Sequence, residues 1–400
     1  MSFYLLQRKL YTFILFLLLF VYSFFLKIKY FPYFVILPLS LIGCMVFLER
    51  IHKGKIKKDF FNFFLILIAM TILYMISYLI NLNGEFYFLK EIVLLSLTYF
   101  LSAFSIKFFF ELFDVEYNFE ILTKLLAFVV SFQLLISLVG YIQPAIFNFI
   151  FSIIDIGLEE STIGDFNAGR MVGVGASFFG SGIINSFMLI IIMYYINNME
   201  NNEGRFKLIF YFIFIAIVGM VSSRTTIIGL ILSIPFLFTK LANLKFFIYL
   251  FFIFLLGWTV FSFVKLDNRI SDLMNFGFGF LYDYNNSQAS GSLSTLQEMY
   301  EVYPDNFKTW ILGDALYKNE FGGYYKNTDV GYLRIIFASG IVGLIAYICM
   351  HVYLIHRAFV GRWLLICITT ILFFVLNFKG VANLYAFLFL YLLIPNRKLN

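Results

Sequence analysis

The chain has 400 residues, of which 62% are hydrophobic, 22% aromatic and only 13% charged, and its formal net charge is +6. Soluble domains carry about 25% charged residues, so this composition excludes a soluble protein. Because the apolar bias covers the whole chain, residues 1–400 are predicted to form a single polytopic membrane domain.

Long apolar runs predict the membrane-spanning helices. A span needs about 20 apolar residues, and by that length the chain has about 12 spans. Their centres lie near residues 18, 40, 70, 98, 131, 185, 215, 232, 255, 339, 371 and 388. The first run follows Arg8 and Lys9 without a small-residue cleavage site, so we expect an uncleaved first helix. The predicted fold class is therefore an all-α polytopic membrane protein.

Basic residues predict the orientation of these spans. Residues 49–59 form the most basic run, and such a run between two spans normally lies in the cytoplasm. A nucleic-acid-binding patch is the rival interpretation, but a basic run in this position is far more often a topology signal, so no nucleic acid is expected. With this run inside, both termini are cytoplasmic. Cys44, Cys349 and Cys367 lie in or at the ends of apolar runs, so no disulfide framework is predicted.

Two segments are predicted on the outer side. Residues 143–172 are amphipathic, which favours a short helix lying in the membrane interface. Residues 265–328 separate spans 9 and 10 and carry more acidic than basic residues. Long loops in compact proteins are usually functional, so we expect a large outer helical loop that caps a site on the outer face.

Charged residues at membrane depth are costly and indicate candidate sites. Arg224 interrupts two apolar runs, next to Ser223, and predicts a tight helix hairpin. The arginine could snorkel to the interface or cap a helix end, or its fork of donors could bind phosphate. Arg170 precedes Gly173 in a glycine-rich approach to the next helix. That pattern suits either an anion site or close packing of membrane helices.

Asp329 begins the tenth predicted span. It could be the N-cap of that helix, or it could act as a general base at the water–membrane boundary. Tyr332 lies one turn further on the same face, and Arg334 lies deeper in the span. No Cys/His cluster indicates zinc, and no phosphate-binding loop motif is present.

Several motifs together resemble the O-antigen and capsular polysaccharide polymerases (Wzy), a family related to the O-antigen ligases. The motifs are Arg170-Met171-Val172-Gly173, Ser223-Arg224-Thr225, Ser290-Gly291-Ser292, Ile311-Leu312-Gly313-Asp314, Thr328-Asp329-Val330-Gly331-Tyr332-Leu333-Arg334 and Ser339-Gly340-Ile341-Val342-Gly343. The ligase relatives have a histidine near the return into the membrane, where this chain has Asp329. Many relatives also have an arginine soon after the Gly-Ser of the large loop, and residues 293–300 contain none.

The resemblance implies a metal-independent glycosyltransferase of the bacterial inner membrane, with its active site facing the periplasm and no cofactor. It would transfer a growing glycan from undecaprenyl pyrophosphate to a new lipid-linked repeat unit, alongside a flippase and a chain-length regulator. Asp329, Arg224 and Arg170 are the expected catalytic residues. The expected substrate-binding residues are Tyr332, Arg334, Arg269, Gly173 and Ser223. An O-antigen ligase and a flippase for lipid-linked oligosaccharides are the alternative functions.

Overall fold

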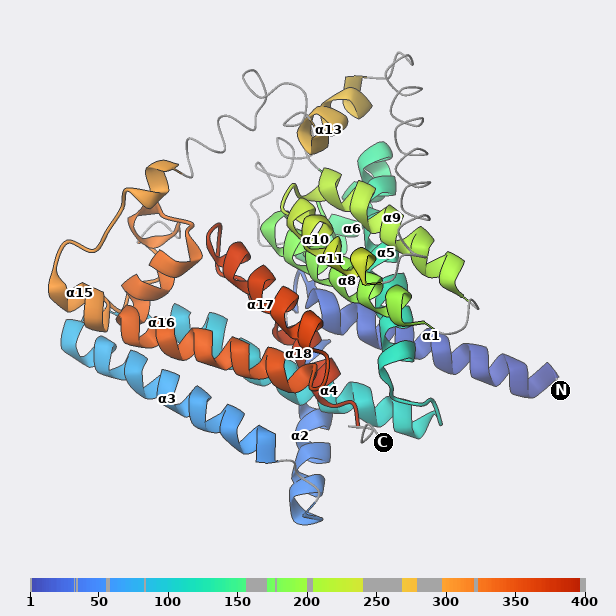
Figure 1. The fold of residues 1–400 in the computed structure, drawn as a ribbon, viewed down its shortest axis with the longest axis horizontal. Coiled ribbons are helices and arrows are strands. Elements are labelled where there is room, and N and C mark those ends of the chain that lie inside the picture. Colours follow the sequence, from blue (N-terminus) through green and yellow to red (C-terminus); the bar gives the residue numbers. More distant parts are fainter. Residues whose placement is uncertain are drawn as a thin grey trace. The chain divides into compact units, whose positions relative to one another are not determined.

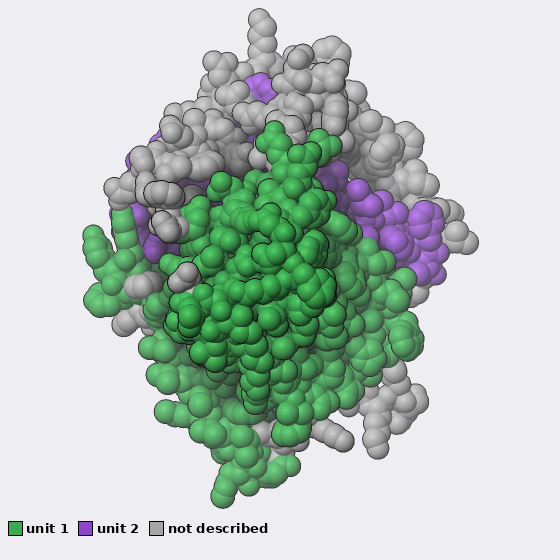
Figure 2. All heavy atoms as spheres, turned by 90° about the vertical axis from the view of Figure 1, so that its left-hand side faces the viewer, with its two compact units in different colours: residues 1–121, 292–400 green, residues 122–291 purple. Residues whose placement is uncertain are grey.

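The computed structural model describes residues 2–31, 33, 35–54, 58–82, 84–155, 171–176, 178–199, 204–239, 268–278, 297–319 and 323–395. These residues are almost entirely helical, as the predicted all-α class requires (Figure 1). The chain divides into two compact units, which are described separately below (Figure 2). Unit 1 comprises residues 1–121 and 292–400, and unit 2 comprises residues 122–291.

Unit 1 contains the N-terminal and C-terminal helices. Its elements are α1 (Ser2–Phe24), β1 (Lys27–Ile28), α2 (Ile36–His52), α3 (Lys58–Asn81), the π-helix η1 (Leu89–Leu94), α4 (Leu95–Leu112), α15 (Phe307–Leu312), the 3-10 helix η3 (Tyr325–Asn327), α16 (Gly331–Ala358), α17 (Trp363–Asn377) and α18 (Tyr385–Leu392). Helix α5 (Phe119–Ile142) begins in unit 1 and continues into unit 2. The other elements of unit 2 are α6 (Pro144–Ile153), β2 (Ile154–Asp155), α8 (Phe178–Asn198), α9 (Arg205–Ser222), α10 (Thr226–Ser233), α11 (Pro235–Phe238) and α13 (Asn268–Phe278).

Six helices of the described chain are long and apolar enough to cross a membrane: Asp59–Asn81, Leu89–Leu112, Phe119–Ile142, Phe178–Asn198, Arg205–Ser222 and Gly331–Ala358. The predicted spans near residues 18, 232 and 371 coincide with shorter apolar helices. The predicted span near residue 255 lies outside the described residues. The chain is thus a helical membrane protein, and the number of 12 spans stays a prediction.

The predicted outer segments also contain helices. Helix α6 occupies the first of them, and its Phe147 and Phe151 pack with Val172 in a buried cluster. In the second, α13 belongs to unit 2 and packs against α9, whereas α15 belongs to unit 1. The segment 265–328 therefore contributes to both units.

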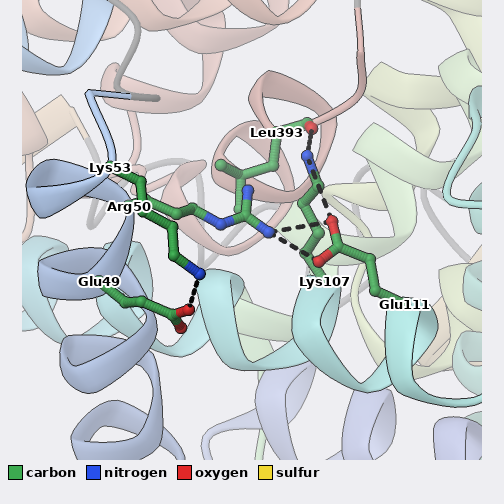
Figure 3. A network of polar contacts seen from close by, with 6 residues as sticks. All are labelled: Glu49, Arg50, Lys53, Lys107, Glu111 and Leu393. Carbon is green, nitrogen blue, oxygen red and sulfur yellow. Dashed lines mark hydrogen bonds and ion pairs between the residues drawn. The ribbon is translucent and has the colours of Figure 1, made fainter.

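A charged network joins three helix ends of unit 1 (Figure 3). Arg50 of α2 donates to both carboxylate oxygens of Glu111 of α4, at 2.9 and 2.8 Å. Lys107 Nζ donates to the carbonyl of Leu393, just beyond α18, at 2.9 Å. Cations at helix C-termini are favourable because the free carbonyls there carry partial negative charge. The predicted topology places these three ends on the same side, and the network joins them.

Helix α16 is broken at Gly340, which has φ 70° and ψ −177°. A Cβ at this position would lie 1.9 Å from the carbonyl oxygen of Ile311, so only glycine fits. The Asp314 N–H donates to the Phe337 carbonyl at 2.6 Å, just before the break. The predicted tenth span is present as Gly331–Ala358 and consists of two helical segments. In Figure 1 the longer part of α16 runs beside α3.

Candidate functional site

The first candidate site surrounds Arg334, near the start of α16. One guanidinium nitrogen of Arg334 lies 3.3 Å from a carboxylate oxygen of Asp329, so the two form an ion pair. The Arg334 side chain is 9% exposed and that of Asp329 is 36% exposed. The cation is thus buried while its partner still meets solvent. A buried cation requires further contacts, because its removal from water is costly.

Two tyrosine rings supply those contacts. The guanidinium carbon of Arg334 lies 3.6 Å from the ring centre of Tyr324 and 4.3 Å from that of Tyr317. Attraction between a cation and an aromatic face strengthens when both are removed from water. We call Asp329, Arg334, Tyr317 and Tyr324 the arginine cage. Both rings belong to residues 313–319 and 323–327, which we call the strap.

The backbone of the strap is strained. Ala315, Lys326 and Asn327 have φ angles of 57°, 52° and 57°, a region that residues with a side chain rarely adopt. The π-helix η1 lies in the same unit, and the charge of its Glu91 acts on Tyr317. Strained residues and π-helical turns are frequent at functional sites. The cage is therefore the strongest candidate site in unit 1.

The structure separates the two interpretations of Asp329. The N-cap of α16 is Val330, and no side chain caps this end, so Asp329 is not a helix cap. Burial raises the pKa of the Asp329 carboxyl, and the charges of Arg334 and Lys379 oppose that rise. A carboxylate with a raised pKa is a better proton acceptor near neutral pH. Its surroundings therefore suit a general base.

Tyr332 holds two helices of unit 1 together. Its hydroxyl donates to the carbonyl of Phe374 in α17 at 2.8 Å, and its ring packs edge-on against Phe378 at 5.2 Å. These contacts fix the start of α16 against the end of α17. Tyr332 thus has a structural role here, whether or not it also binds substrate.

The second candidate site lies in unit 2, between α9 and α10. These helices are joined by residues 223–225, so the tight hairpin predicted around Arg224 is present. The Arg224 Nε donates to the carbonyl of Phe276 in α13 at 2.7 Å. Its guanidinium carbon lies 4.4 Å from the centre of the Phe276 ring. Arg224 therefore connects the hairpin to α13, and anion binding by this residue stays a prediction.

Ser223 and Gly173 are both buried in packing contacts of unit 2. A Cβ at Gly182 would lie 2.6 Å from the Ser223 hydroxyl, so α8 approaches the hairpin closely. A Cβ at Gly173 would lie 2.5 Å from Gln133 Nε2 of α5. Both contacts favour the interpretation that small residues here pack helices together.

The other expected site residues are only partly described. Arg170 lies outside the described residues. Arg269 lies in α13, where its backbone alone is described. Within the described chain, no group of three or more His, Cys, Asp or Glu side chains could hold a metal ion.

Sequence reasoning identified Asp329 and Arg334, which the structure brings together, but it missed Tyr317 and Tyr324. The available signal was the repeated tyrosine, at positions 317, 324 and 325, in the segment predicted to lie on the outer side. Arg224 belongs to unit 2 and the cage to unit 1, so each site is defined within its own unit.

No family model, curated protein or solved structure matches this chain.

Proposed function

We propose that this chain polymerises lipid-linked oligosaccharide repeat units at the outer face of the bacterial inner membrane, as the resembled Wzy family does. The observation that supports the proposal most is the state of Asp329. It is a partly exposed carboxylate with a raised pKa, paired with a buried arginine at the start of a long apolar helix. The sequence motif that carries the resemblance includes both residues of this pair.

In the proposed reaction, Asp329 removes the proton from a hydroxyl of the acceptor repeat unit. The hydroxyl oxygen forms a bond to the anomeric carbon of the growing glycan. The bond between that carbon and the pyrophosphate oxygen breaks, and undecaprenyl pyrophosphate leaves with the bonding electrons. The growing glycan is then one unit longer and attached to the acceptor's lipid.

The leaving pyrophosphate accumulates negative charge, which fixed cations stabilise in the transition state. We assign this role to Arg224 and Arg170, whose guanidinium groups match phosphate oxygens better than an ammonium group does. Arg334 is assigned to holding Asp329 in place. Arg269 is assigned to binding the donor.

A lipid-linked oligosaccharide flippase is the second candidate function. The break of α16 at Gly340 favours it, because transporters commonly contain discontinuous helices at their substrate sites. A flippase moves its lipid-linked substrate without changing the length of the glycan. The two functions are therefore separable by the product alone.

The test is to reconstitute the purified protein in liposomes that contain many copies of a lipid carrying a single repeat unit, and to measure the length of the glycan products. The proposal predicts a ladder of products from the wild type and single units from Asp329→Asn. The matched control is Asp305→Asn, which changes an outer-loop carboxylate that is 75% exposed and pairs with Lys326. A ladder from Asp329→Asn would exclude Asp329 as the base, and no ladder from the wild type would refute the polymerase.

A further inference from the structure

Glu85 binds the strap from a different part of unit 1, the outer connection between α3 and η1. Its carboxylate oxygen Oε1 accepts the N–H of Tyr317 at 2.9 Å and also the N–H of Lys318. Its own N–H donates to the carbonyl of Ala315 at 3.1 Å. Glu85 therefore makes three hydrogen bonds to the backbone of residues 315–318.

The neighbours of Glu85 reinforce this attachment. The hydroxyl of buried Tyr74 donates to the carbonyl of Glu85 and lies 3.2 Å from that of Ala315. A Cβ at Gly84 would lie 2.8 Å from the Cβ of Ala315, so the two segments are in close contact. Ala315 has the positive φ that needs outside support, and these hydrogen bonds supply it.

Tyr317 connects Glu85 to the arginine cage. Glu85 accepts a hydrogen bond from the backbone N–H of Tyr317. The ring centre of the same Tyr317 lies 4.3 Å from the guanidinium carbon of Arg334. Arg334 in turn pairs with Asp329. A continuous series of contacts thus runs from Glu85 through Tyr317 and Arg334 to the carboxylate of Asp329.

We propose that Glu85 is a positioning residue that fixes the strap so that Tyr317 holds Arg334 against Asp329. As a role in polymerisation, this inference rests on the proposed function, whereas its structural content does not. The group that Glu85 supplies is an acceptor oxygen with two lone pairs, which the amide oxygen of glutamine also has. Glu85→Gln should therefore preserve the cage, and Glu85→Ala should release it.

The experiment is carboxyl footprinting of the purified full chain with a water-soluble carbodiimide and glycine ethyl ester, read by mass spectrometry at Asp329. We expect Glu85→Ala to raise labelling of Asp329 several-fold, because the ion pair no longer protects the carboxylate. We expect Glu85→Gln to label as the wild type does. The matched control is Glu91→Ala, which removes a carboxylate near Tyr317 for which no hydrogen bond to the strap is present among the described residues.

Wild-type labelling of Asp329 in Glu85→Ala, or an equal rise in Glu91→Ala, would overturn the inference. If Glu85→Ala does not fold, Tyr74→Phe carries the test, because it removes only the hydroxyl that contacts the carbonyls of Glu85 and Ala315. Tyr74→Phe should raise labelling of Asp329 above the wild-type level, and wild-type labelling would overturn the inference. The initial rate of chain extension is measured on the same variants, and a rate lower by on the order of 10–100-fold is expected for Glu85→Ala.

The two readouts separate the inference from the proposed function. If labelling changes as expected while Asp329→Asn still makes polymer, Glu85 positions the cage and the cage is not the polymerase site. If Asp329→Asn abolishes polymer but labelling does not respond to Glu85→Ala, the function stands and the positioning role fails.

Discussion

Arg334 shows how a cation can be stable when its side chain is almost fully buried. Its charge is balanced by Asp329, and the rings of Tyr317 and Tyr324 lie close to its guanidinium. These contacts depend on the planar shape of the guanidinium, not only on its charge. A lysine at this position would keep the charge and lose the stacking.

Arg334→Lys should therefore reduce polymer formation about tenfold. Cation–π contacts are worth from about 0.5 kcal/mol at exposed sites to about 2 kcal/mol when desolvated, and Tyr317 is buried whereas Tyr324 is exposed. The measurement is the initial rate of chain extension by the reconstituted protein. Arg357→Lys, the same change near the other end of α16, is the control, and it should leave the rate unchanged. Equal rates for wild type and Arg334→Lys would show that charge alone suffices.

The raised pKa of Asp329 predicts a pH dependence. A base must be ionised to accept a proton, so the extension rate should fall as the pH drops through this raised value. The raised pKa also affects stability. The folded state binds this proton more tightly than the unfolded state does, so the contribution of the carboxyl to stability decreases as the pH rises. The pH profile of the extension rate tests the first statement. A rate that stays constant down to the ordinary range of aspartate would exclude Asp329 as the titrating base.

At this scale the sequence allowed the charged residues to be found and not their partners. Asp329, Arg334 and Arg224 were recognisable because charges are rare in apolar runs. Glu85 and Tyr317 are 232 positions apart in the chain, and no local pattern reports their contact. No sequence pattern indicated that Phe276 is the partner of Arg224, since any backbone carbonyl could accept the hydrogen bond from the Arg224 Nε.

At the scale of elements, the break in α16 is the main feature that the sequence did not indicate. The hydropathy of residues 331–358 is continuous and predicts the span without its break. The break results from contact with the strap: Gly313 has φ 78°, and a Cβ there would lie 2.6 Å from the backbone nitrogen of Ser339. Two of the quoted motifs, one around Gly313 and the other around Gly340, thus meet at a backbone crossing.

Gly340→Ala should destabilise the protein by at least about 1–3 kcal/mol from its backbone conformation alone, before the clash with Ile311 is counted. Thermal unfolding in detergent measures the change. Gly180→Ala is the matched control, because a Cβ there meets nothing within 4 Å and its φ is not positive. If both variants unfold at the wild-type temperature, the crossing is not a fixed feature of the fold.

At the scale of the whole molecule, the contacts within unit 1 agree with the predicted alternation of spans. Arg357, in the last turn of α16, pairs with Asp59 at the start of α3 at 2.5 Å, and Arg362, just before α17, stacks on Phe119 at the start of α5 at 4.3 Å. Spans that alternate in direction bring these ends to one side. These contacts fit the predicted alternation, and the side that each end faces stays a prediction.

Which side faces the cytoplasm is testable with single cysteines in a background lacking the native ones. Phe307→Cys should react with an impermeant maleimide in intact cells, because this exposed residue begins α15 in the outer segment. His52→Cys, at the exposed end of α2, should react only after the membrane is opened. The reverse pattern would invert the topology and place the arginine cage on the cytoplasmic side.

The measurement that tests the polymerase most directly is the glycan profile of a host that lacks this gene and keeps every other gene of the pathway. If the chain is the polymerase, this host makes glycans of a single repeat unit in place of a ladder of lengths. A full ladder without the gene would contradict it. So would lipid-linked units trapped on the inner leaflet, which would identify a flippase.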